Sequence, residues 1–155
     1  MLKKLSNNID YFEDYNLLAI VSHLKDYTLC YHINTNLKLD LIKYEDLDFP
    51  IPPDEENSFS WYYFEDSISR TTYYLIGNKG DLGNLRPSHK TVDYFLLIKN
   101  PVDNELVKSI IVNLRKVPNI TAVLDLNMHQ AKDMDLLLET IELHELEYVK
   151  RRSGK

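Results

Sequence analysis

The chain has 155 residues, 44% of them hydrophobic and 27% charged, which is the composition of one globular domain rather than of a disordered chain. With a formal net charge of −6, the chain lacks the positive electrostatic field that attracts nucleic acids and anionic membranes, so we expect neither as a partner. The single cysteine, Cys30, excludes an internal disulfide and a cysteine-rich zinc site. With no signal peptide and no apolar run of about 20 residues, we expect a cytoplasmic protein.

Apolar and aromatic patterning predicts the first elements in chain order: a strand at 16–21, a helix at 25–37, a strand at 39–49, a surface loop at 50–57, and a hairpin of strands at 59–64 and 71–76. The helix is indicated by Leu29, Ile33 and Leu37, whose spacing places them on one face. The loop is expected because prolines and acidic residues dominate that segment.

The second half of the chain predicts a loop containing Gly77, Gly80 and Gly83, a strand at 92–98, a helix between Asp103 and Pro118, a strand at 121–126, and a last helix from Asp133 or Asp135 to about Lys150. Asp103 is the expected N-cap of the first of these helices, and Pro118 ends it. Because strand, helix and strand follow one another here, we expect a right-handed parallel crossover.

Together these elements predict one α+β domain over residues 1–155, with flexible ends at 1–8 and 151–155. We expect a mainly antiparallel sheet, helices packed on one face of it, and one late parallel β-α-β crossover. The 11 tyrosines suit strands that are buried on one side and wet on the other, although an aromatic binding surface is the alternative.

The last helix carries two apolar faces at 100° per residue. One broad face contains Leu137, Leu138, Ile141, Tyr148 and Val149. A second patch contains Leu136, Leu143 and Leu146. This patch either rests on a loop or neighbouring strand, or is buried against another copy of the chain. Glu145 lies amid the broad face, so we expect it to pair with a cation or that face to be partly open.

No catalytic set is complete in the sequence. The loop at 77–83 lacks the Lys-Ser/Thr pair of a phosphate loop and the spacing of a dinucleotide fingerprint. His144 opens a His-Glu pair like that of a zinc protease, but Tyr148 stands where the second histidine ligand belongs. Asp26 lies one helical turn before Cys30 and is expected to raise the pKa of its thiol. We therefore expect no catalytic residue, no cofactor and no metal site.

Residues 86–94 read Arg-Pro-Ser-His-Lys-Thr-Val-Asp-Tyr. This segment resembles the defining motif of the bacterial IPExxxVDY family, with Pro87 at the motif proline and residues 92–94 as its Val-Asp-Tyr ending. Residues 22–30 also resemble that family's first helix, and the similar layout extends over residues 10–145. The resemblance implies membership of a family of unknown function and adds no particular activity.

Two positions depart from the motif, since Arg86 stands in place of its isoleucine and Ser88 in place of its glutamate. If that glutamate carried chemistry, this chain lacks it. The leading interpretation of the motif is structural, as a strand start docked under the glycine-containing loop. The alternative is a binding site formed by Pro87, Asp93 and Tyr94.

The leading functional hypothesis is a noncatalytic protein-interaction or adaptor domain that binds itself or another protein. A homodimer formed through Leu136, Leu143 and Leu146 is the form we expect. The alternative is a small-molecule-binding protein or enzyme, with a tyrosine-lined pocket near Asp93 and the loop at 77–83.

Overall fold

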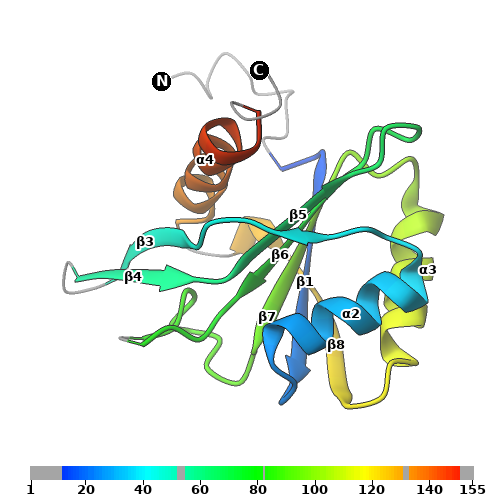
Figure 1. Cartoon of the computed structure of the whole chain (residues 1–155), viewed down its shortest axis with the longest axis horizontal. Coiled ribbons are helices and arrows are strands. Elements are labelled where there is room, and N and C mark those ends of the chain that lie inside the picture. Colours follow the sequence, from blue (N-terminus) through cyan, green and yellow to red (C-terminus); the bar gives the residue numbers. More distant parts are fainter. Residues whose placement is uncertain (1–11, 52–54, 82, 131–132, 151–155) are drawn as a thin grey trace.

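The computed structural model describes residues 12–51, 55–81, 83–130 and 133–150 (Figure 1). The predicted flexible ends at 1–8 and 151–155 lie outside the described residues, as do residues 52–54 of the predicted surface loop. Among the described residues, no helix has the length and apolar character that a membrane span requires.

The chain forms a mixed α+β fold, as predicted. Its described elements are β1 (Tyr15–Ser22), α2 (Asp26–Leu37), β2 (Ile42–Lys43), β3 (Leu47–Ile51), β4 (Glu55–Phe59), β5 (Trp61–Glu65), β6 (Thr72–Gly77), β7 (Tyr94–Lys99), α3 (Asn104–Arg115), β8 (Ile120–Leu126), a 3₁₀ turn (Met128–Gln130) and α4 (Met134–Glu145), which continues as a π-helical turn (Leu146–Lys150).

A six-stranded sheet in the order β2-β5-β6-β7-β1-β8 forms the centre of the fold, beside a two-stranded ribbon of β3 and β4. Neighbouring strands in the described chain pair antiparallel throughout, which confirms the predicted mainly antiparallel sheet. β7 and β8 are joined through α3, and each pairs antiparallel with β1, which lies between them. They run in the same direction without pairing with each other, and the right-handed parallel crossover stays a prediction.

Helices cover both faces of the sheet, with α2 and α3 on one side and α4 on the other (Figure 1). The side chains of β1 point alternately to the two faces of the sheet and so contribute to two separate core clusters. Leu18 clusters with Leu29 of α2 and Ile110 of α3. Leu17 clusters instead with Ile141 of α4. The prediction that the helices pack on one face was therefore wrong. The uninterrupted apolar run of β1 is the pattern of a strand that is buried on both faces.

Two predictions for the segment 39–57 were also wrong. The single strand expected in its first part is divided into β2 and β3, and the expected surface loop contributes to the ribbon of β3 and β4. In this ribbon Leu47 lies opposite Phe59 and Pro50 lies opposite Glu56. Leu47 and Phe59 are buried in the core cluster between the sheet and α4, which we call the α4-side core. Proline is tolerated here because an edge strand has backbone N–H groups that need no partner strand.

The other predicted elements are confirmed to within a few residues. The predicted hairpin is formed by β5 and β6, with Trp61 opposite Ile76. The helix α3 begins as expected, because Asp103 Oδ1 accepts a hydrogen bond from the Leu106 backbone N–H at 3.0 Å. Asp133 does occupy the N-cap position of α4, but its side chain forms no capping hydrogen bond there.

Candidate functional site

The segment 86–94 that resembles a family motif forms a pair of turns before β7. The His89 backbone N–H donates to the Arg86 carbonyl at 2.9 Å, and the Val92 N–H donates to the His89 carbonyl at 3.1 Å. Pro87 lies exposed in the first of these turns, several residues before the strand begins. It therefore shapes a turn rather than the entrance of the strand.

Asp93 and Tyr94 attach the start of β7 to the end of β1. Asp93 Oδ2 accepts a hydrogen bond from the Ser22 backbone N–H at 2.8 Å. The Tyr94 hydroxyl donates to the Leu24 carbonyl at 2.6 Å. Val92 packs in the core on the α4 side of the sheet, whereas Tyr94 packs against the core on the α2 side. Alternation along a strand that began at Val92 would place both side chains on one face, but β7 begins at Tyr94. The hydrogen bonds of Asp93 and Tyr94 position the segment that leads into α2.

Asn78 holds the turns together, and nothing in the sequence marks it. Its side chain is fully buried. Its Nδ2 donates to the His89 carbonyl at 2.9 Å and to the Val92 carbonyl at 2.7 Å. Its Oδ1 accepts from the Arg86 N–H at 2.8 Å. One amide side chain thus satisfies three backbone groups of a loop that has no regular secondary structure of its own.

A groove of about 760 Å³ lies beside Asp93, Tyr94, Gly77 and Gly80, where the tyrosine-lined pocket was expected. The structure brings these four residues together and leaves Pro87 outside the lining. The walls are mainly Asp, Lys and Ser side chains, and Tyr94 is the only tyrosine among the lining residues of the described chain.

Several charges of this groove already have partners within the chain. Lys43 Nζ lies 3.4 Å from Asp26 Oδ2 and 3.5 Å from Asp46 Oδ1. The Tyr62 hydroxyl also donates to Asp26, at 2.9 Å. In the described part of the chain, no group of three or more His, Cys, Asp and Glu side chains is arranged to hold a metal ion.

Cys30 is a core residue of α2. Burial, followed by the charge of Asp26, raises the pKa of its thiol to about 11. Its Sγ lies 3.6 Å from the Leu41 carbonyl oxygen. A thiol with this pKa is almost entirely protonated at neutral pH and is a poor nucleophile.

Glu145 on α4 is held by two tyrosines of the sheet and by a lysine. It accepts hydrogen bonds from the Tyr63 hydroxyl at 3.0 Å and from the Tyr74 hydroxyl at 2.6 Å. Lys150 Nζ lies 3.6 Å away. Burial, together with the Glu145 carboxylate, raises the pKa of both tyrosines. The carboxylate in the apolar face therefore does pair with a cation, and it fastens α4 to the sheet.

His144, the other half of the zinc-protease-like pair, is a packing residue. Its ring lies 4.6 Å, centroid to centroid, from the rings of Trp61 and Tyr148. Its Nε2 lies 2.7 Å from the Glu45 carbonyl oxygen. These contacts explain the position of the His144 side chain without a bound ligand.

The second apolar patch of α4 lies on the surface. Leu136, Leu143 and Leu146 are 48%, 59% and 60% exposed, so no described loop or strand covers most of them. A groove of about 370 Å³ adjoins the patch, and Leu143 and Leu146 line it together with charged side chains.

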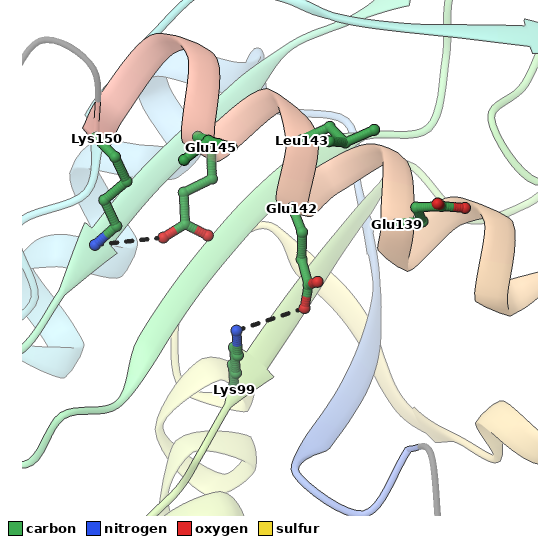
Figure 2. Close-up of a pocket in the computed structure, with 7 residues that line it drawn as sticks. Lys99, Glu139, Glu142, Leu143, Glu145 and Lys150 are labelled. Atoms are coloured by element: carbon green, nitrogen blue, oxygen red, sulfur yellow. Dashed lines mark hydrogen bonds and ion pairs between the residues drawn. The ribbon is translucent and has the colours of Figure 1, made fainter. Parts of the chain in front are cut away.

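Two ion pairs line this groove. Figure 2 shows Glu142 pointing towards Lys99 at the end of β7, and Glu145 pointing towards Lys150. Lys99 Nζ lies 3.5 Å from Glu142 Oε2. The Tyr15 hydroxyl also donates to Glu142. The outer face of α4 thus combines exposed leucines with fixed charges of both signs.

Comparison with protein-family models, with curated proteins and with solved structures gives no match for this chain. The resemblance of residues 86–94 to the IPExxxVDY motif therefore stays a prediction. Functional proposals for this chain depend on its own geometry.

Proposed function

We propose that this protein is a noncatalytic interaction module that pairs with a second copy of itself through the outer face of α4. The observation that carries the proposal is the exposure of Leu136, Leu143 and Leu146 beside a charged groove. Fully burying a leucine side chain is worth about 1.5–3 kcal/mol. Transferring three half-exposed leucines of each copy into a contact supports an association of moderate strength.

The spacing along this face suits a helix partner. Positions 136, 139, 143 and 146 recur at intervals of three, four and three residues, which is the a and d spacing of a coiled-coil seam, and Lys150 follows at the end of the π-helical turn. We call these five residues the α4 seam, and they are Leu136, Glu139, Leu143, Leu146 and Lys150. All but Leu136 line the groove of Figure 2, so the seam and the groove form one surface.

Charge along the α4 seam favours an antiparallel pair. In that arrangement an a position of one copy lies opposite a d position of the other, which places Leu143 opposite Leu146 and brings Glu139 towards Lys150 at the end of the partner's π-helical turn. A parallel pair would instead place Glu139 opposite Glu139 and Lys150 opposite Lys150, and like charges in an interface are unfavourable. Lys150 is 45% exposed and, although it contacts Glu65 and Glu145, it has three donors to offer.

Replacing Leu143 with glutamate is expected to abolish the pairing. The substitution places a carboxylate in both central layers of the contact, so we expect the dissociation constant to rise at least about 100-fold, or ~2.7 kcal/mol. Sedimentation velocity from low micromolar to several hundred micromolar protein measures this change.

Val112→Glu is the matched control, because Val112 is an apolar residue of α3 that is 51% exposed and lies off the α4 seam. It should sediment like the unmodified chain. If the unmodified chain is monomeric over the whole range, or if Val112→Glu dissociates the dimer as strongly as Leu143→Glu, the proposal is wrong.

We also propose that this pairing takes place in the cytoplasm. Cys30 is a free and buried thiol, and a reduced lone cysteine suits a reducing compartment. The acidic surface and the leucine patch then support a protein partner rather than nucleic acid or membrane.

A further inference from the structure

The groove of about 760 Å³ beside Asp93 and Tyr94, which we call the polar groove, lies at one end of the six-stranded sheet. Gly77, the last residue of β6, pairs there with Tyr94, the first residue of β7. The Gly77 N–H donates to the Ser60 carbonyl at 3.0 Å, so Ser60 lies on its other side. Further wall residues come from the start of α2 and from the loop after β6. The polar groove therefore combines segments that are far apart in the sequence.

Gly77 keeps the floor of the polar groove open. A Cβ atom at this position would lie 2.7 Å from Ser60 Oγ, which is closer than such contacts occur in proteins. A side chain here would therefore displace Ser60. The Ser60 hydroxyl has no hydrogen-bond partner among the described residues, so it can both donate to a ligand and accept from one.

Charges of both signs surround this floor. In the described part of the chain, three lysines and four aspartates line the polar groove. Lys25 and Asp81 are exposed and form no hydrogen bond or ion pair with another described residue. Asp93 uses one carboxylate oxygen, Oδ2, for the Ser22 N–H and keeps the other. The polar groove thus offers both ammonium donors and carboxylate acceptors to a ligand.

We propose that the polar groove binds a neutral carbohydrate. Each sugar hydroxyl is one donor and carries two acceptor lone pairs, so one molecule satisfies the Asp81 and Asp93 carboxylates together with the Lys25 ammonium. An anion would meet the four carboxylates and a cation the three ammonium groups, and like-charge contacts are costly. An apolar ligand would displace water from these charges without replacing its hydrogen bonds.

The polar groove is also preorganised and large enough for a disaccharide. The Ser22 N–H holds Asp93 at 2.8 Å, and the Leu24 carbonyl holds the Tyr94 hydroxyl at 2.6 Å. Binding therefore does not have to order these side chains. A six-membered ring fits a cavity of ~150 Å³, so about 760 Å³ accommodates a disaccharide with bridging waters.

Titration of the full chain with neutral sugars, followed by amide chemical shifts, tests the proposal. The sugars are glucose, galactose, mannose, maltose and lactose, and glucuronate and glucosamine add a charge of either sign to the ring of glucose. We expect at least one neutral sugar to cause saturable shifts at Lys25, Gly77 and Asp93. Neither charged sugar should bind more tightly than the best neutral sugar. No saturable shift with any neutral sugar, or tighter binding of a charged one, would overturn the proposal.

Three variants locate the binding site. Lys25→Ala and Asp81→Ala each remove one exposed charge, whereas Ser58→Trp fills the polar groove from β4 and keeps both charges. Each should weaken binding of the best sugar at least about fivefold. Lys108→Ala is the control, because Lys108 is a lysine of α3 whose side chain is 72% exposed. If Ser58→Trp, or both charge variants, bind the sugar as Lys108→Ala does, the ligand lies elsewhere and the proposal is wrong.

Discussion

Replacing Asn78 with leucine is expected to lower the free energy of unfolding by about 4 kcal/mol. The substitution leaves the Val92 carbonyl and the Arg86 N–H without their partner in the interior, and it leaves the His89 carbonyl with the Val92 N–H alone. A buried backbone group that loses its partner costs about 1–3 kcal/mol. Urea unfolding followed by circular dichroism measures the loss, and an unchanged m-value shows that the comparison is valid.

Asn36→Leu is the matched control for this change. Asn36 also donates through its side-chain amide, to the His32 carbonyl at 2.8 Å, but it lies exposed on α2. Its replacement should change stability by less than about 0.5 kcal/mol. If Asn78→Leu costs no more than Asn36→Leu, the buried amide does not organise the turns before β7.

The folded chain is expected to lose stability steeply above pH 10, because tyrosines that stay protonated in the folded interior lose their protons in the unfolded chain. Burial, and next the Glu145 carboxylate, raises the pKa of Tyr63 and Tyr74. In the unfolded chain both hydroxyls ionise near pH 10. Such groups contribute stability that is fully present below the unfolded pKa and is lost as the pH rises towards the folded pKa.

The expected slope follows from proton linkage. Each tyrosine that stays protonated only in the folded chain lowers the free energy of unfolding by about 1.4 kcal/mol per pH unit above pH 10. Tyr63 and Tyr74 together therefore remove about 2 kcal/mol between pH 10 and pH 11, where the unfolded hydroxyls are only partly ionised. Tyr94, whose pKa burial raises to about 12, acts in the same direction. Urea unfolding at a series of pH values gives the slope, and absorbance at 295 nm reports the phenolates.

Tyr74→Phe should reduce this slope by about 1.4 kcal/mol per pH unit, since it removes one of the titrating groups. Tyr27→Phe is the control, because it also removes a tyrosine hydroxyl but from a side chain that is 63% exposed. A flat stability profile up to pH 11, with phenolates appearing in the folded protein near pH 10, would contradict this expectation.

Local patterns were enough to predict most elements. The apolar run of β1 and the Asp103 cap of α3 each act over a few residues, and both were located correctly. The segment 39–57 was misassigned because its prolines and acidic residues favour a turn locally. In the folded chain, contacts of Leu47 and Phe59 with the α4-side core outweigh that preference.

Side-chain networks that join distant segments could not be predicted in the same way. Tyr74 and Glu145 are 71 residues apart in the chain, and no spacing rule relates them. In the sequence, Asn78 is an ordinary loop residue after Gly77. Its role depends on hydrogen bonds to the turns before β7, which form only in the folded chain. The outward position of Leu143 followed from helical periodicity alone, because each residue of an α-helix is rotated by about 100° from the one before it.

The most direct measurement of self-pairing is disulfide formation between two singly substituted chains, Leu143→Cys and Leu146→Cys. The antiparallel α4 seam places these positions opposite each other, whereas two copies of either variant alone hold their new thiols too far apart to bridge. Cys30 adds little background, since burial raises the pKa of its thiol to about 11. Covalent dimer should form faster in the mixture than in either variant alone or in Val112→Cys. Equal rates in all four samples would contradict pairing through α4.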